Sequence, residues 1–276
     1  MRIIGLLLVW CLSSVAQAVV VSDLYQVRVP VQDQTTAVRE SALKEALQLA
    51  LVKVAGVSDV TQQESIQAKI GTPDVYVKSF RYVRQESDAS LWLEVSFAQN
   101  LIDELLRSAQ QPIWGKSRPL ILMWQAVEES RERRILSQST DEWRMPFEQA
   151  MSERGLPLLW PVQDMEDQMA LPPGSLWGLF REDIRRASER YMADAQLAGR
   201  LVPVAGGYAY RGYLQHQGET LELSAEAEDT QTTLRQVADQ VASFMAQKYA
   251  VRNNGDQTGQ MIMVSGVGNF RQYHDL

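Results

Sequence analysis

Cysteine and histidine are nearly absent from this chain. It contains one cysteine, Cys11, and two histidines, His216 and His274. Once the predicted leader that holds Cys11 is removed, no disulfide, thiolate metal site or thiol nucleophile can form. His216 falls in a predicted hairpin turn, where we expect an exposed side chain, and His274 falls near the end of the chain. Neither suits the histidine of a serine triad, which lies between a nucleophile and a carboxylate. We therefore predict no catalytic residue, no metal site and no cofactor.

An excess of positive charge and a long apolar run are also missing. The chain has 27 Lys and Arg against 34 Asp and Glu, a net charge of −7. Binding of nucleic acid depends largely on neutralising phosphates, so an acidic chain without a basic block is a poor candidate for it. Beyond the N-terminus the longest apolar stretch, residues 49–57, is interrupted by Lys53. We expect no transmembrane segment in the mature chain.

The first 18 residues have the pattern of a secretory signal peptide. A positive start at Arg2 is followed by an apolar stretch over residues 3–15 and then by Ala16-Gln17-Ala18. This order predicts cleavage after Ala18 and a periplasmic location. Cys11 could instead suggest a lipid anchor, but Trp10 stands where a lipoprotein signal needs a small residue. Soluble export is the preferred interpretation.

Residues 19–110 are predicted to form a β-α-α-β-β-α domain. A strand over 20–31 precedes a helix whose apolar stripe comprises Ala42, Leu43, Ala46, Leu47, Ala50, Leu51 and Val54. Gly56 should end that helix in a left-handed cap. Thr61 and Glu64 form a capping-box pattern that should begin a second helix ending at Ile70. Two alternating strands, 75–84 and 90–98, form a hairpin, and a short helix follows over 100–109.

Residues 118–250 are predicted to form a second α/β domain, after an aperiodic boundary at 110–118. The expected strands are 119–124, 156–160 and 195–204, followed by an antiparallel pair, 208–214 and 220–227, that turns at Gln217-Gly218. The expected helices are 141–154, 161–170, 176–191 and 234–249, and 130–134 should be a charged loop. Pro146 is an alternative start for the first of these helices. The fold class is thus α+β or α/β, with two small sheets covered by helices and antiparallel hairpins.

The last stretch, residues 251–276, reads as a linker followed by a strand-like segment over 261–267. Two interpretations stay open. It is the start of a truncated third unit, or it docks back on the second domain.

Three clusters of residues are candidate sites, and each has a structural alternative. Asp164, Glu166 and Asp167 could contribute to a metal site but fit better as a solvated helix start. Four arginines at 181, 185, 186 and 190 could bind an anionic polymer or lipid headgroup, yet the acidic residues between them favour a solvent-exposed face, with Glu182 pairing with Arg186. Tryptophans are common at recognition surfaces and in cores alike. The tentative interaction surface comprises Trp160, Trp177, Arg181 and Arg185.

Several stretches of the chain resemble two known families. Residues 24–31, 39–56, 118–124 and 176–178 resemble the bacterial domain-of-unknown-function family 2066 (DUF2066), whose members are exported proteins of Gram-negative bacteria without an assigned activity. Residues 191–201, the hairpin after them and residues 234–239 resemble the N-terminal domain of the Tol-Pal periplasmic protein TolB and related envelope lipoproteins. That second resemblance implies an α/β module that docks partner proteins, although fold analogy alone does not fix function.

These observations predict an exported cell-envelope protein that acts as a non-catalytic binding or scaffold module. Its partner would be an envelope protein or a cell-wall polymer. Two alternatives stay open: an envelope hydrolase that uses acidic residues, and a peripheral lipid-binding protein. A pocket that brings carboxylates together would favour the hydrolase, and an apolar groove or a basic face would favour lipid binding.

Overall fold

The computed structural model of the protein describes residues 19–85, 89–129, 132–139 and 143–252. The predicted signal peptide and the strand-like segment over 261–267 lie outside these residues, as does His274. We name residues 19–110 the N-terminal unit and residues 118–252 the second unit. That the two are separate domains stays a prediction.

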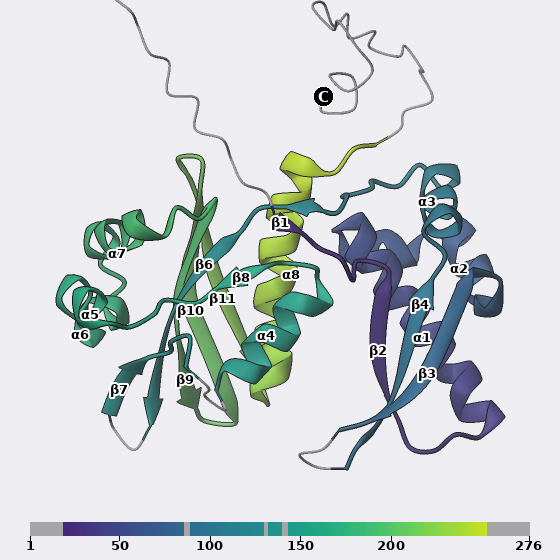
Figure 1. The fold of residues 1–276 in the computed structure, drawn as a ribbon, viewed down its shortest axis with the longest axis horizontal. Coiled ribbons are helices and arrows are strands. Elements are labelled where there is room, and N and C mark those ends of the chain that lie inside the picture. Colours follow the sequence, from purple (N-terminus) through teal and green to yellow (C-terminus); the bar gives the residue numbers. More distant parts are fainter. Residues whose placement is uncertain (1–18, 86–88, 130–131, 140–142, 253–276) are drawn as a thin grey trace, which may run out of the picture.

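The N-terminal unit is a three-stranded antiparallel sheet with helices on one face (Figure 1). The strand order is β2-β4-β3, and the elements are β2 (Gln26–Val31), α1 (Thr36–Ala55), η1 (Ser58–Gln62), α2 (Glu64–Ile70), η2 (Pro73–Tyr76), β3 (Val77–Arg84), β4 (Leu91–Phe97) and α3 (Gln99–Ser108). Apolar residues of α1 pack on Val29, Leu93 and Val95 of the sheet. The opposite face of the sheet carries polar side chains.

The predicted long helix is confirmed as α1. All seven residues of its apolar stripe are buried, and it ends at Gly56 with φ 78°. A left-handed cap is least costly at glycine because there is no Cβ to clash. The period of the apolar residues therefore placed this helix and its buried face correctly.

Two predictions for the N-terminal unit were wrong in detail. The strand expected over 20–31 is interrupted by a turn, and β1 (Val19–Val20) pairs with β5 (Ser117–Arg118) instead of extending β2. At the turn, the buried Lys53 ammonium donates to the carbonyl oxygens of Asp23 (3.0 Å) and Gln26 (3.4 Å). The predicted capping box does not form, because Gln63 is the N-cap of α2 and Thr61 belongs to η1.

The second unit is built on a six-stranded mixed sheet. Its strands are β6 (Ile121–Glu129), β7 (Glu132–Ile135), β8 (Leu158–Leu159), β9 (Ala195–Val204), β10 (Gly207–His216) and β11 (Glu219–Ala227). The order is β11-β10-β9-β6-β7, and β8 pairs beside β6. β6 runs parallel to β8 and β9, whereas β9, β10 and β11 form an antiparallel meander. The predicted hairpin turn at Gln217-Gly218 is confirmed.

Helices cover both faces of this sheet. The helices are α4 (Arg144–Glu153), α5 (Met165–Ala170), α6 (Pro173–Trp177), α7 (Arg181–Ser188) and α8 (Thr230–Tyr249), with η3 (Glu189–Tyr191) after α7. One core contains Phe147 of α4 and Val241 of α8, and the other contains Leu176 of α6 and Ile184 of α7. In Figure 1, α4 and α8 lie between the six-stranded sheet and the N-terminal unit.

Several element boundaries in the second unit differ from the prediction, three of them in ways that change the type or number of elements or the start of a helix. Residues 132–135 are strand β7 rather than a charged loop, because they pair with the end of β6. The helix expected over 176–191 is two helices, with Leu179 at φ 54° between them. Helix α4 begins at Arg144, two residues before Pro146, and residues 140–142 lie outside the described part.

The aperiodic segment at 110–118 is not an exposed linker. Trp114 and Arg118 are 1% and 0% exposed. The Arg118 guanidinium donates to five carbonyl oxygens, those of Lys53, Trp114, Gly115, Arg154 and Gly155. It also stacks on the Trp114 ring at 3.8 Å. This segment therefore forms part of the buried contact between the two units.

Within the described ranges, no helix combines the length and the apolar character that a bilayer span requires.

Candidate functional site

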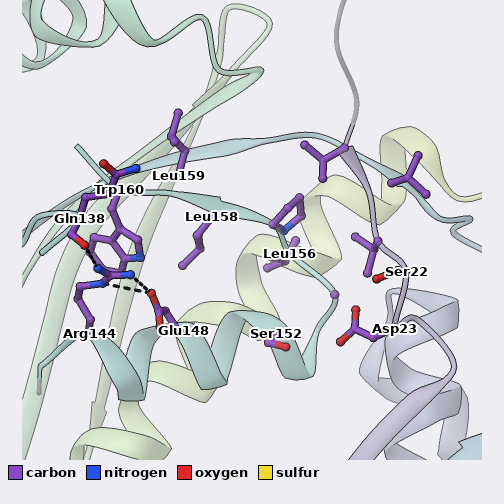
Figure 2. A pocket seen from close by; sticks show the side chains of 15 residues that line it. Ser22, Asp23, Gln138, Arg144, Glu148, Ser152, Leu156, Leu158, Leu159 and Trp160 are labelled. Atoms are coloured by element: carbon purple, nitrogen blue, oxygen red, sulfur yellow. Dashed lines mark hydrogen bonds and ion pairs between the residues drawn. The ribbon is translucent and has the colours of Figure 1, made fainter. Parts of the chain in front are cut away.

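A groove runs along α4 between the two units, and we call it the α4 groove. It consists of two cavities of about 500 Å³ and 690 Å³ that share Asp23, Glu148 and Ser152 as lining residues. The smaller cavity, shown in Figure 2, lies between α4, β8 and the segment 19–23. The larger cavity lies between α4 and the polar face of the N-terminal sheet.

The amphipathic character of α4 explains why it lines a groove. Phe147, Ala150 and Met151 are buried in the core of the second unit. The opposite side of the helix carries the polar residues that line the cavities, namely Arg144, Glu148, Gln149, Ser152 and Glu153. Arg144, Glu148 and Ser152 are four residues apart, as are Gln149 and Glu153, so all five lie on one side of the helix.

The smaller cavity has a tryptophan wall. The Arg144 guanidinium lies 5.2 Å from the centre of the Trp160 ring and is ion-paired with Glu148. Trp160 is only 4% exposed, and its indole Nε1 has no hydrogen-bond partner among the described residues. A buried donor left without an acceptor is unfavourable. The Trp160 N–H is covered by neighbouring atoms, so Trp160 presents only its ring to the cavity.

The larger cavity has a cross-strand charge ladder. Arg28, Glu94 and Arg81 are aligned across β2, β4 and β3, and Glu94 accepts 2.7 Å hydrogen bonds from both arginines. Burial alone would raise the pKa of Glu94. The hydrogen bonds and charges of the two guanidinium groups outweigh it and hold that pKa below its ordinary value.

Lys53 is the buried cation of this cavity. It is 4% exposed and pairs with Asp23 at 3.4 Å. Burial lowers the pKa of Lys53, and the Asp23 carboxylate opposes that shift.

Acidic side chains from separate segments do meet in the larger cavity, which sequence reasoning did not find. Asp23, Glu94, Glu148 and Glu153 all line it. Each is ion-paired within the protein, to Lys53, to Arg28 and Arg81, to Arg144 and to Arg235, respectively. The four residues are separated by up to 130 positions and fit no motif, so only the fold brings them together.

The structure does not bring the four predicted surface residues together. Trp160 lies in the core beside α4 and α8, whereas Trp177 packs against the core on the other face of the sheet. Trp177 contacts two guanidinium groups, those of Arg133 at 4.4 Å and Arg200 at 5.6 Å. Of the four, only Trp160 lines the α4 groove.

The arginines of α7 are exposed but neutralised. Arg181 pairs with Glu222 of β11, and Arg185 pairs with Glu182 and Glu189. Arg186 pairs with Asp183, not with Glu182 as its spacing predicts. This arrangement matches the charge-laced solvent face better than a patch for an anionic polymer.

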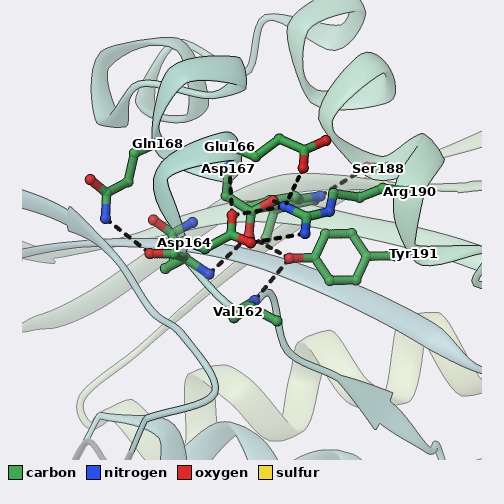
Figure 3. Close-up of polar contacts among 10 residues, drawn as sticks. Val162, Asp164, Glu166, Asp167, Gln168, Ser188, Arg190 and Tyr191 are labelled. Carbon is green, nitrogen blue, oxygen red and sulfur yellow. Dashed lines mark hydrogen bonds and ion pairs between the residues drawn. The ribbon is translucent and has the colours of Figure 1, made fainter.

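The acidic cluster at 164–167 is an ion-pair network, shown in Figure 3. Arg190 contacts Asp164 at 2.8 Å and Asp167 at 3.0 Å, and Tyr191 donates to Asp167. Asp167 is fully buried, so this part of the cluster is not solvated as expected. Asp164 caps α5 by accepting from the Asp167 amide. The network joins α5 to η3.

His216 is buried, which corrects the expectation of an exposed turn residue. It is 2% exposed, and its ring nitrogens contact the Asp194 carbonyl oxygen at 2.8 Å and the Tyr249 hydroxyl at 2.7 Å. It ends β10, one residue before the turn, and faces the C-terminal end of α8. Among the described residues, no three His, Cys, Asp or Glu side chains are placed to hold a metal ion.

Comparison with known proteins matches one part of the chain. The model of a domain of unknown function, DUF8605, matches residues 18–115. This overturns the resemblance to DUF2066, which rested on short stretches of common residues. No curated protein and no solved structure matches the chain, so the resemblance to TolB has no support and is withdrawn. The matched region spans the N-terminal unit and most of the segment that carries Trp114.

Proposed function

We propose that the protein is exported and acts as a non-catalytic binding module of the cell envelope, with the α4 groove as its contact site. This proposal rests on one observation, the pairing of the charged side chains in the groove. Every charged side chain that lines either cavity is ion-paired with another side chain of the protein. Such a groove offers shape and hydrogen bonds to a partner, with no unpaired acid or base to drive proton transfer.

The proposal of export rests on residues 1–18. Their order of charge, apolar core and Ala-Gln-Ala is typical of a signal peptide.

Site-specific photo-crosslinking in intact cells tests this proposal. A photoreactive residue at Gln149, on the groove side of α4, should capture a partner, whereas one at Glu226 on β11 should not. Ser152→Trp, which places a large side chain where the two cavities meet, should abolish the crosslink. Thr220→Trp, an exposed position on β11 away from the groove, should leave it intact.

Equal crosslinking from Gln149 and Glu226, or a crosslink that survives Ser152→Trp, would contradict the groove as the contact site. Cell fractionation that finds the protein in the cytoplasm would contradict export.

A second candidate, an envelope hydrolase that uses acidic residues, is favoured by one observation. Four carboxylates line the same cavity of about 690 Å³. A general acid needs a raised pKa, but the pKa of Glu94 is lowered by Arg28 and Arg81. Release of soluble fragments from purified peptidoglycan by the protein, and its loss in Glu148→Gln, would establish this candidate over the first.

Lipid binding is a third candidate with less support. Apolar side chains, among them Val20, Leu156 and Leu158, do line the smaller cavity. The groove lacks the basic face that an anionic headgroup would need, because four carboxylates line the larger cavity. The arginines of α7 are neutralised by neighbouring carboxylates.

A further inference from the structure

Strand β8 has an open edge at the smaller cavity. It pairs only with β6 among the described strands, in parallel, with Ile121 opposite Leu158. The Ile121 amide donates to the Pro157 carbonyl oxygen at 3.0 Å. In a parallel pair of strands, Ile121 forms its hydrogen bonds with the residues on either side of Leu158. The N–H and C=O of Leu158 itself therefore point away from β6. Neither group has a partner among the described residues.

The open edge is short and bounded at both ends. Beyond β8, the Gln138 amide donates to the Pro161 carbonyl oxygen at 2.8 Å. On the other side, the Val21 amide donates to the Lys116 carbonyl oxygen at 2.9 Å and holds the segment 19–23 in place. The space between these contacts is the smaller cavity, and a few residues of extended chain would fill this stretch of edge.

The Trp160 ring also lines this cavity, although its Nε1–H is buried and does not reach it. The cavity therefore presents the backbone N–H and C=O of Leu158 beside an aromatic ring. A polypeptide backbone offers donors and acceptors in alternation at strand spacing, which a glycan or a lipid does not.

The charges at the rim indicate which peptides fit. The carboxylates of Asp23 and Glu148 are 51% and 43% exposed, whereas their cationic partners Lys53 and Arg144 are 4% and 18% exposed. The solvent side of these two pairs is therefore acidic. In Figure 2 the Leu158 side chain lies on the α4 side of β8 and the Leu159 side chain on the other. In an added strand, every second side chain would face α4 and meet this acidic rim.

We propose that the smaller cavity binds an extended segment of a partner polypeptide as a strand added to β8. The N–H and C=O of Leu158 pair with the main chain of that segment, and a basic side chain of the segment faces α4 and the carboxylates of Asp23 and Glu148. This inference rests on the proposed binding function and names the class of partner.

The probe is a phage-displayed library of random 12-residue peptides, selected on the purified protein from Val19 onward. A selected peptide is then synthesised with a fluorophore, and its Kd is measured by fluorescence anisotropy. Selected peptides should be enriched in Lys and Arg relative to the starting library. On peptide addition, the Leu158 amide should become protected from hydrogen exchange.

Three variants test the geometry. Glu148→Gln removes one carboxylate of the acidic rim but keeps the shape of the side chain, and we expect a Kd about threefold higher with little change in the melting temperature. Leu158→Pro removes the outward N–H and should weaken binding at least as much, because proline is tolerated where the amide does not pair. Leu159→Pro removes the N–H that faces β6, so it should lower the melting temperature and serves as the matched control.

An unchanged Kd in Glu148→Gln, an unprotected Leu158 amide, peptides without excess Lys or Arg, or no selected peptide would each overturn strand addition. The Glu148→Gln and exchange measurements keep the test valid if Leu158→Pro fails to fold. The Gln149 crosslink reports separately on the proposed function. If it persists while strand addition fails, the groove binds its partner in another way; if it fails while peptides bind, the cavity has no such role in the cell.

Discussion

Arg118 joins three segments that are far apart in the sequence. Its guanidinium donates to the last turn of α1 through Lys53, to the turn after α4 through Arg154 and to its own segment through Trp114. The C-terminal carbonyls of a helix lack partners within the helix and carry partial negative charge. One buried cation thus satisfies the ends of two helices. Burial, helped by the nearby Arg154, lowers the pKa of Arg118 to about 9, which still leaves it charged at neutral pH.

Replacing Arg118 by methionine should therefore destabilise the folded protein strongly. We expect Arg118→Met to reduce the free energy of unfolding by about 3 kcal/mol or more, because several buried carbonyl oxygens lose their donors. Arg186→Met is the matched control, since Arg186 is 60% exposed and forms one surface ion pair with Asp183. Its effect should stay within about 1 kcal/mol. Urea denaturation measures both values, and equal losses would contradict the role of Arg118.

Sequence reasoning could not single out Arg118 or His216. Arg118 lies in a stretch without periodicity, and His216 lies beside a turn; both contexts usually mean exposure. Their burial depends on groups that arrive from distant positions, such as the Lys53 carbonyl and the Tyr249 hydroxyl. Apolar periodicity, by contrast, is encoded locally.

The short helix α5 is held at its start by charge. Asp164 caps it and pairs with Arg190 of η3. The side-chain hydrogen bonds from Arg190, with the Asp167 amide, lower the pKa of Asp164 to about 2. In the unfolded chain an aspartate titrates near pH 3.9. The stabilisation is therefore fully present above about pH 4 and is lost as the pH falls towards 2.

Asp164→Asn should reveal this pH-dependent stabilisation by the Asp164–Arg190 ion pair. Asparagine also caps helices, so the substitution mainly removes the charge that faces Arg190. At pH 6 the variant should be less stable than the parent protein, and the difference should shrink as the pH falls from about 4 to about 2. Urea midpoints across this range measure it. A difference that does not change with pH would rule out the ion pair as its cause.

At the scale of elements, long amphipathic segments were predictable and short ones were not. The stripes of α1 and α8 and the alternation in β4 and β11 placed these elements correctly because each buries one face. The break between α6 and α7 and the pairing of β7 with β6 were missed. Both depend on tertiary contacts: the Arg200 guanidinium of β9 donates to the Trp177 carbonyl oxygen at the end of α6, and β7 needs the end of β6 as its partner.

At the C-terminal end of α1, small residues allow the two units to approach closely. Gly56 ends α1, and a Cβ added there would lie 2.5 Å from the Cβ of Ala246 in α8 and 2.9 Å from the Trp114 ring. The Arg154 guanidinium donates to the Gly56 carbonyl oxygen at 3.1 Å from the other unit. The C-terminal end of α1 is therefore in close contact with α8.

A pair of glycine substitutions separates this contact from backbone strain. Gly56 and Gly206 have φ of +78° and +90°, but a Cβ at Gly206 would meet no atom within 4 Å. Gly206→Ala should cost about 1 kcal/mol in stability from strain alone. Gly56→Ala should cost about 1 to 3 kcal/mol more, because it also forces α1 and α8 apart. Thermal unfolding of the two variants measures the difference, and similar losses would mean that the units do not pack closely at Gly56.

The shared interface also predicts how the whole molecule unfolds. Because Trp114 and Arg118 are buried between the units, neither unit can open without exposing them. We expect a single urea transition, with tryptophan fluorescence and far-ultraviolet circular dichroism giving the same midpoint. Two separated transitions would show that the units unfold independently.

By itself, the sequence determined the mixed α/β class, the long helices, the hairpins and the glycine cap of α1. Each of these follows from local period or from a backbone conformation that a particular residue favours. Only the tertiary structure decided that Trp114 and Arg118 are buried, that four carboxylates line one cavity, and that β8 has an open edge beside an unpaired indole. Those features join positions from Asp23 to Arg235, and no local pattern records which distant groups will meet when the chain is packed.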